Sequence, residues 1–104
     1  MTPRIHELPC AVICWTQEGC PACESYLPKF LAVAEKYKQC LPVLVVDVNL
    51  APGAADAFGV QGTPLTVISR WGKRSFRFID GDSSEQLIEN LFFQATRGLD
   101  CPVV

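Results

Sequence analysis

Two cysteines separated by two residues lie in the segment EGCPAC, which runs from Glu18 to Cys23. An apolar run precedes the segment, and a helical pattern begins at Pro21. Residues three positions apart lie on the same side of a helix, so the sulfur atoms of Cys20 and Cys23 are close enough to bond. Such a pair can carry electrons, bind a metal, or consist of two ordinary thiols.

The place of the pair at a helix start favours the thiolate form of Cys20. The helix dipole and unpaired backbone N–H groups stabilise an anion there, and in such motifs the cysteine pKa falls to roughly 3.5–7.5 from about 8.5. We therefore expect Cys20 to be the nucleophile and Cys23 to be the thiol that resolves a mixed disulfide. Pro21 has no N–H to offer the sulfur, whereas the Glu18 carboxylate should raise the thiol pKa somewhat.

Zinc binding is the main chemical alternative for this pair. A zinc site needs four ligands, usually two such pairs or one pair with histidines. The sequence has His6 as its one histidine and no second C-x-x-C, and Cys10 and Cys14 would complete only an improvised set. We therefore expect no metal and no cofactor.

The composition is that of a globular chain. Its 104 residues are 49% hydrophobic and 19% charged, which predicts one domain over residues 1–104. A net charge of −2 gives no support for a nucleic-acid or anionic-membrane partner, and no apolar run has the length of a membrane span. The start lacks the long apolar region of a signal peptide, so we expect a cytoplasmic protein. Six cysteines there favour redox or metal chemistry over a disulfide framework.

Hydrophobic patterning predicts four strands and three helices. Continuous apolar runs predict strands buried on both faces at residues 10–15 and 41–49. Further strands are expected from about Leu65 and over residues 75–80, joined by a turn at 71–74. Helices are expected over residues 21–38, within 51–59, and from Ser83, which with Gln86 predicts a capping box, to Gly98. The expected apolar helix faces hold Tyr26, Leu27, Phe30, Leu31, Ala34 and Tyr37 in the first helix, and Leu87, Ile88, Leu91, Phe92 and Ala95 in the last.

The order of these elements predicts the fold class. The first two strands flank a helix, so they should be parallel with a right-handed crossover, and the last two should form an antiparallel hairpin. The expected architecture is an α/β fold with a mixed four-stranded sheet and helices on both faces. Residues 1–9 form an N-terminal segment and 98–104 a C-terminal tail.

Several motifs together resemble the thioredoxin family. They are CPAC after a strand, Pro28 five residues beyond the second cysteine, VVDVN in the second strand, GVQGTPLTVI, and a DG before the last helix. The likeness covers roughly Cys10 to Ala95. It implies a thioredoxin-like fold trimmed at the N-terminus, dithiol–disulfide exchange through Cys20 and Cys23, and a cis Thr63–Pro64 bond. From local sequence alone, Pro64 would be a trans proline that opens a strand.

The resemblance also assigns residues to a substrate groove. Thr63, before the proline, would offer backbone hydrogen bonds to an extended substrate, with Pro64 beside it. Gly81 lies where the family keeps a glycine that leaves the groove open. Gly19, where the family usually has a tryptophan, and Pro21 would border the reactive pair.

The proton acceptor of the family has no direct counterpart. Family members often hold a buried acid six residues before the first cysteine, and that position is Cys14 here. A thiol is a poor proton acceptor, so Asp47 in the second strand is the nearest substitute by topology. The alternative is that Asp47 is an ordinary strand-end acid in water.

We therefore expect a monomeric thiol–disulfide oxidoreductase that reduces protein disulfides and is recycled by a separate reductase. One alternative is a binding module of the same fold that docks a protein partner with little redox turnover, through the groove or a basic hairpin. That hairpin carries Arg70, Lys73, Arg74 and Arg77 beside Trp71, although edge protection by charge explains it more simply. The acidic flank around Glu18 disfavours a glutathione-dependent, glutaredoxin-like reductase, because cationic side chains would be needed there to bind the carboxylates of glutathione.

The remaining cysteines and large aromatic residues have structural interpretations. Cys10, Cys14 and Cys40 are expected to be small buried hydrophobic residues. Cys101 lies in the tail, and Trp15 and Phe58 are expected in the core.

Overall fold

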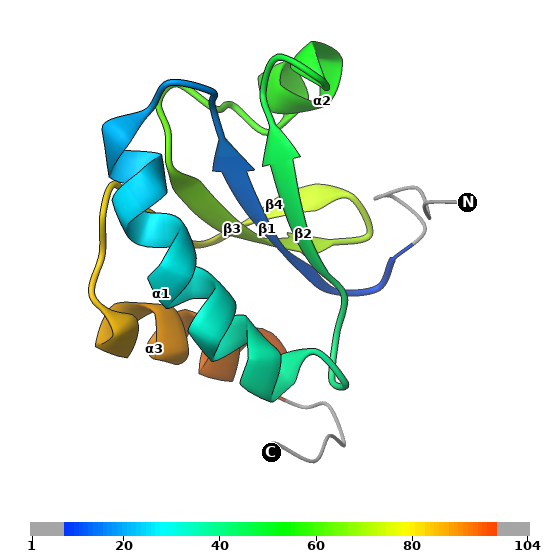
Figure 1. The fold of residues 1–104 in the computed structure, drawn as a ribbon. Helices are drawn as coiled ribbons and strands as arrows, with labels where there is room; N and C mark the ends of the chain where they lie inside the picture. Colours follow the sequence, from blue (N-terminus) through cyan, green and yellow to red (C-terminus); the bar gives the residue numbers. More distant parts are fainter. Residues whose placement is uncertain (1–7, 98–104) are drawn as a thin grey trace.

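The computed structural model describes residues 8–97, so His6, Gly98 and Cys101 lie outside the described residues. A four-stranded sheet has the order β2-β1-β3-β4 and carries helices on both faces (Figure 1). The mixed α/β fold expected from the sequence is confirmed. The strands are β1 (Ala11–Thr16), β2 (Val43–Asp47), β3 (Leu65–Arg70) and β4 (Lys73–Asp80), and the helices are α1 (Pro21–Tyr37), α2 (Pro52–Ala57) and α3 (Glu85–Thr96).

Strand β1 lies inside the sheet, between β2 and β3. It pairs in parallel with β2, and α1 makes the crossover between them. It pairs antiparallel with β3, which places Trp15 at the end of β1 opposite Leu65 at the start of β3. The loop after β1 and the loop before β3 therefore meet at one end of the sheet.

The two faces of the sheet have separate apolar cores. Successive residues of a strand point to opposite faces, so Val12 and Cys14 pack under α1 and α3, while Ile13 and Trp15 pack on the side of α2. On the first side an aromatic series joins the two helices, with ring contacts between Tyr26 and Phe30, Phe30 and Phe92, and Tyr37 and Phe92. On the second side the rings of Trp15 and Phe58 lie 5.7 Å apart, and both residues are buried as expected.

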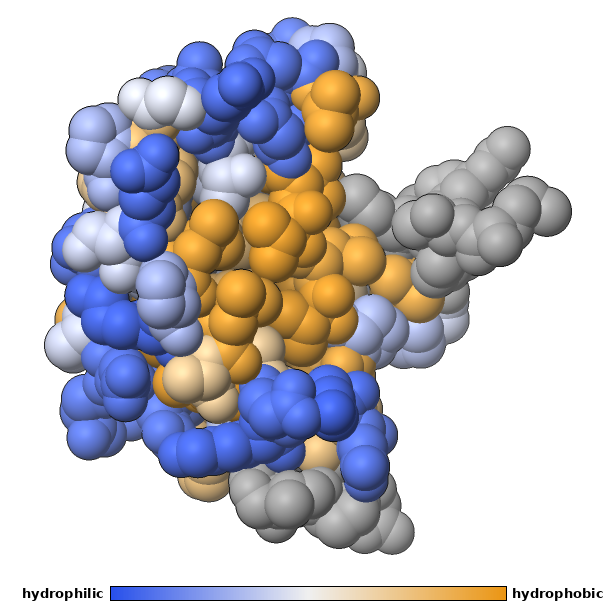
Figure 2. Space-filling view, in the orientation of Figure 1, coloured by the Kyte–Doolittle hydropathy of each residue, from blue (hydrophilic) through white to orange (hydrophobic). Residues whose placement is uncertain are grey.

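Strand β2 differs from its prediction as a strand buried on both faces. It is one of the two edge strands of the described sheet, and its five residues are half-buried or exposed. Val45 is 46% exposed, and Leu50 just beyond the strand is 85% exposed. Apolar surface follows this edge in Figure 2. The apolar run predicts a strand, but its burial depends on which strands flank it in the sheet.

The β3–β4 hairpin is tighter than predicted. Arg70 pairs with Lys73, so the turn is Trp71–Gly72 alone and β4 begins two residues earlier than expected. Trp71 and Gly72 have φ values of 55° and 81°, which is the two-residue turn whose twist matches paired strands. A glycine suits its second position because that backbone conformation is strained for other residues.

The last helix begins one residue later than predicted. Ser84 is the N-cap, and its side chain accepts a hydrogen bond from the Leu87 amide at 3.3 Å. Ser83 instead donates from its hydroxyl to the Asp80 carbonyl at 3.2 Å. Leu87, and Leu31 in α1, are 48% and 52% exposed, so both lie outside the buried helix faces to which the periodicity assigned them. Within residues 8–97, no helix is long and apolar enough to cross a membrane.

Candidate active site

Cys20 and Cys23 form a disulfide at the start of α1. Cys20 is the N-cap of the helix, and its sulfur accepts a hydrogen bond from the Cys23 amide at 3.1 Å. Pro21 occupies the first turn, where a missing N–H costs no hydrogen bond. Cys20 is half-buried, whereas Cys23 is only 3% exposed. A partner molecule can therefore reach the first sulfur far more easily than the second.

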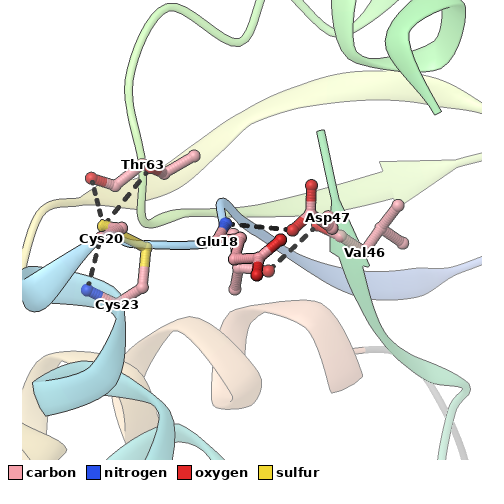
Figure 3. The surroundings of a disulfide bond; sticks show 7 residues. Glu18, Cys20, Cys23, Val46, Asp47 and Thr63 are labelled. Carbon is pink, nitrogen blue, oxygen red and sulfur yellow. Dashed lines mark hydrogen bonds between the residues drawn. A yellow bond between two sulfur atoms is a disulfide. The ribbon is translucent and has the colours of Figure 1, made fainter. Parts of the chain in front are cut away.

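The loop before β3 lies directly against the exposed sulfur (Figure 3). The Thr63 hydroxyl donates to Cys20 Sγ at 3.5 Å, and the Thr63 carbonyl oxygen lies 3.6 Å from the same sulfur. The Thr63–Pro64 peptide bond is cis, as the family resemblance implies. This arrangement follows from the sheet order, because β3 pairs with β1.

Gly81 directly follows β4 and lies at the same end of the sheet. Its amide donates to the Pro64 carbonyl at 3.0 Å, and its φ of 68° favours glycine. A Cβ added to Gly81 would meet no atom within 4 Å, so the space beside it is open. Of the residues that the resemblance assigns to a substrate groove, Thr63, Pro64 and Gly81 thus lie together, whereas Gly19 lines the hollow on the other side of the pair.

Asp47 lies at the end of β2, on the other side of the reactive pair. Its Oδ2 accepts from the Glu18 amide at 3.0 Å and its Oδ1 accepts from the Asn49 amide at 2.7 Å. Figure 3 shows this link between Asp47 and the loop that leads to Cys20. Both carboxylate oxygens accept hydrogen bonds from backbone N–H groups, so the geometry supports a role in holding the loop.

A hollow of about 350 Å³ opens between Asp47 and the pair. Cys20 and Cys23 both line it, together with Gly19 in the loop. The carboxylates of Glu18, Glu24 and Asp47 also line it, and among the residues described there no lysine or arginine does. The hollow is therefore acidic and suits anionic ligands poorly.

A buried polar group that the sequence did not reveal lies under the sheet. The hydroxyl groups of Tyr26 and Thr66 are 2.7 Å apart, and both residues are fully buried. Burial raises the pKa of Cys14 to about 11, against a smaller lowering by its hydrogen bond with Thr66. Burial also raises the pKa of the Tyr26 phenol. These groups are neutral near pH 7, so none of the three is an ionised proton acceptor.

Two other described cysteines lie far from the reactive pair in the packed core. Cys10 is buried, its thiol donates to the Ala95 carbonyl at 3.4 Å, and burial raises its pKa. Cys40 packs against the same core but is only partly buried and is disulfide-bonded, so the expectation that it is a small buried hydrophobic residue is wrong. Among residues 8–97, no group of three or more histidine, cysteine or acidic side chains is placed to hold a metal ion.

A second depression of about 480 Å³ was not predicted from the sequence. It begins at Thr63 and Pro64 and extends toward β4, where Arg74 and Phe78 line it. Only the basic residues of the hairpin gave a signal in the sequence, because the depression forms between segments far apart in the chain.

Comparison with known proteins agrees with this geometry. The thioredoxin family model matches residues 5–92. Thioredoxin 1 of Chlorobaculum tepidum is 32% identical over 74 residues, which cover 71% of this chain and 72% of that protein. The fold is also similar to two solved structures, at 15% and 19% identity. The oxidised thioredoxin of Plasmodium falciparum has a TM-score of 0.73, with 88% of this chain and 86% of that chain covered. The Malassezia sympodialis thioredoxin has a TM-score of 0.74, with 85% and 76% covered.

These matches and the Cys20–Cys23 disulfide together indicate thiol–disulfide oxidoreductase chemistry. The chain belongs to the thioredoxin family.

Proposed function

We propose that this chain reduces disulfides in other proteins, with Cys20 as the nucleophile and Cys23 as the resolving thiol. The observation that carries the proposal is the unequal exposure of two bonded sulfurs at a helix start. The amide of Cys23 points at the exposed sulfur, and in the reduced protein the same N–H would stabilise a Cys20 thiolate. The reachable sulfur is thus also the better nucleophile.

The reaction proceeds in two exchanges. The Cys20 thiolate attacks one sulfur of the substrate disulfide, forms a mixed disulfide and expels the other substrate sulfur as a thiolate. The Cys23 thiolate then attacks Cys20 Sγ, which closes the Cys20–Cys23 disulfide and expels the second substrate sulfur. Two electrons pass to the substrate, and both expelled thiolates take up protons from water. A separate dithiol reductase returns two electrons to the pair.

A protein substrate has a place to bind beside the reactive sulfur. Thr63 touches that sulfur and lies at the start of an open depression. We propose that the substrate chain lies extended along Thr63 and Pro64, with Gly19 and Gly81 leaving room on either side. Thioredoxins in general act on protein disulfides and are recycled by a reductase, and we propose the same partners for a monomer in the cytoplasm.

The acidic hollow argues against glutathione as the reductant. Glutathione is anionic, and the described residues around Cys20 on that side supply three carboxylates and no cation. A dithiol reductase therefore suits the site better than glutathione.

Insulin reduction tests the proposal. The wild type should catalyse it with a dithiol as electron source, Cys20→Ser should abolish it, and Cys23→Ser should accumulate a mixed disulfide detectable by mass spectrometry. Cys10→Ala is the matched control, because it removes a buried thiol remote from the pair and should leave the rate unchanged.

Two results would contradict the proposal. A wild type that binds protein partners but never reduces a disulfide would support the binding-module alternative. Faster turnover with glutathione than with a dithiol reductant would support the glutaredoxin-like alternative.

A further inference from the structure

The depression beyond Pro64 contains a cation that is held in place. Arg74 of β4 donates from Nη1 to the Phe58 carbonyl at 2.8 Å and, less directly, to the Gly59 carbonyl at 3.4 Å. Its guanidinium carbon lies 4.7 Å from the centre of the Phe78 ring. The hydrogen bond to Phe58 satisfies a carbonyl at the C-terminal end of α2, where a cation is favourable. The contact with the Phe78 ring is a cation–π contact.

The position of Arg74 leaves part of its binding capacity unused. A guanidinium has five N–H donors in a planar fork, and the hydrogen bonds of Arg74 to Phe58 and Gly59 both come from one nitrogen, Nη1. The ion pairs of the described residues join Lys29 with Asp82, Lys36 with Glu89 and Lys38 with Glu35, so Arg74 has no acidic partner among them. Arg74 is exposed and lines the depression, so the remaining donors are available to a ligand.

The two sides of the reactive sulfur therefore differ in charge. The hollow beside Asp47 is lined by three carboxylates. The depression beyond Thr63 contains Arg74 over Phe78, although Asp80 also lines it next to Gly81. A substrate with an acidic residue near its cysteine is repelled on the first side and is attracted on the second.

We infer that Arg74 selects substrates by binding an acidic side chain close to the reactive disulfide. This inference rests on the proposed disulfide reductase function and adds a substrate class to it. The ligand is an extended, disulfide-bonded segment that carries Asp or Glu near the cysteine. Phe78 supplies an apolar surface for the stem of that side chain, and the guanidinium binds its carboxylate.

Three synthetic disulfide peptides test the inference directly. They are identical except for one residue next to the cystine on its N-terminal side, which is Glu, Gln or Lys. For an exposed ion pair, the wild type should show a kcat/KM about fivefold higher for the Glu peptide than for the Gln peptide. The Lys peptide should be the slowest, and added salt should shrink the differences.

Substitutions in and near the depression identify the residue that is responsible for the preference for Glu. Arg74→Gln should remove the preference for Glu, whereas Arg74→Lys should keep part of it, because the charge remains without the planar fork. Asp80→Asn should increase the preference, since it removes the competing carboxylate. Lys73→Gln is the matched control, because Lys73 is the neighbouring exposed cation on β4 and does not line the depression. Circular dichroism checks that each variant is folded.

The outcomes separate this inference from the proposed function. Equal reduction of all three peptides by the wild type, or an undiminished preference in Arg74→Gln, overturns the role of Arg74 and leaves the reductase intact. Failure of the wild type to reduce any peptide or insulin overturns the proposed function, and the inference falls with it. The salt dependence of the wild type is a test that needs no variant.

Discussion

Replacement of Asp47 distinguishes a structural brace from a proton acceptor. In Asp47→Ala the amides of Glu18 and Asn49 lose their carboxylate acceptors. Each bond is exposed, so water replaces part of it when it is lost. We therefore expect each to contribute about 1 kcal/mol to stability, which is below the range for buried bonds to a charged group. We expect Asp47→Ala to lower the free energy of unfolding by about 2 kcal/mol.

The effect on catalysis should be smaller and independent of pH. The Glu18 bond fixes the loop that delivers Cys20, and a loss of about 1 kcal/mol of positioning corresponds to about fivefold in kcat/KM. Asp47→Asn should have an effect no larger than that of the alanine variant, because its one oxygen still serves one amide while its NH₂ group faces the other. In both variants the pH–rate profile should keep the shape of the wild type.

Stopped-flow reduction of a disulfide substrate across neutral and mildly alkaline pH provides the measurement. Asp56→Asn is the matched control, since it removes an exposed carboxylate from α2 and should change neither stability nor rate appreciably. Accumulation of the mixed disulfide in Asp47→Asn, with a shifted pH profile, would refute a purely structural role for Asp47 and establish it as the proton acceptor. A variant as stable and as active as the wild type would show that neither role matters.

Two further predictions concern the buried polar group. Burial raises the pKa of Cys14 to about 11, so the folded protein binds this proton more tightly than the unfolded chain does. Its stabilising contribution is complete below the unfolded pKa of about 8.5 and is lost as pH rises toward 11, by about 3 kcal/mol. Cys14→Val should weaken that pH dependence in chemical denaturation, and an unchanged slope would contradict the assignment. Thr66→Val should cost about 1–3 kcal/mol by leaving the Tyr26 hydroxyl buried without its partner. Adding Tyr26→Phe should recover much of that loss, and additive costs in the double-mutant cycle would show that the two hydroxyl groups do not interact.

The features predictable from the sequence are those with a local cause. Apolar runs and helical periodicity predict the order of the elements, and the short spacing of Cys20 and Cys23 at a helix start predicts that their sulfurs meet. The place of Thr63 beside Cys20 required one further step, the adjacency of β3 and β1. That adjacency follows from the family resemblance and not from any local pattern.

The unpredicted features depend on contacts between distant parts of the chain. Tyr26 and Thr66 are 40 positions apart, and Arg74 reaches Phe58 across 16. Nothing in either local sequence indicates its partner. The capping serine was misassigned because the local pattern was misleading: Ser83 has Gln86 at capping-box spacing, whereas Ser84, the actual N-cap, has Leu87 there.

The proton balance of the resolving step follows from the same contacts. Cys23 must lose a proton before it attacks Cys20, yet it is only 3% exposed. Cys14 stands where family members often hold a buried acid, and a thiol whose pKa is about 11 accepts no proton near neutral pH. Each oxygen of Asp47 accepts from a backbone amide, and the hollow beside it is lined by Cys20 and Cys23 and opens to solvent. We therefore expect water in that hollow to accept the proton. In the Asp47 experiment the resolving step must accordingly accelerate with pH in the wild type and in both variants alike.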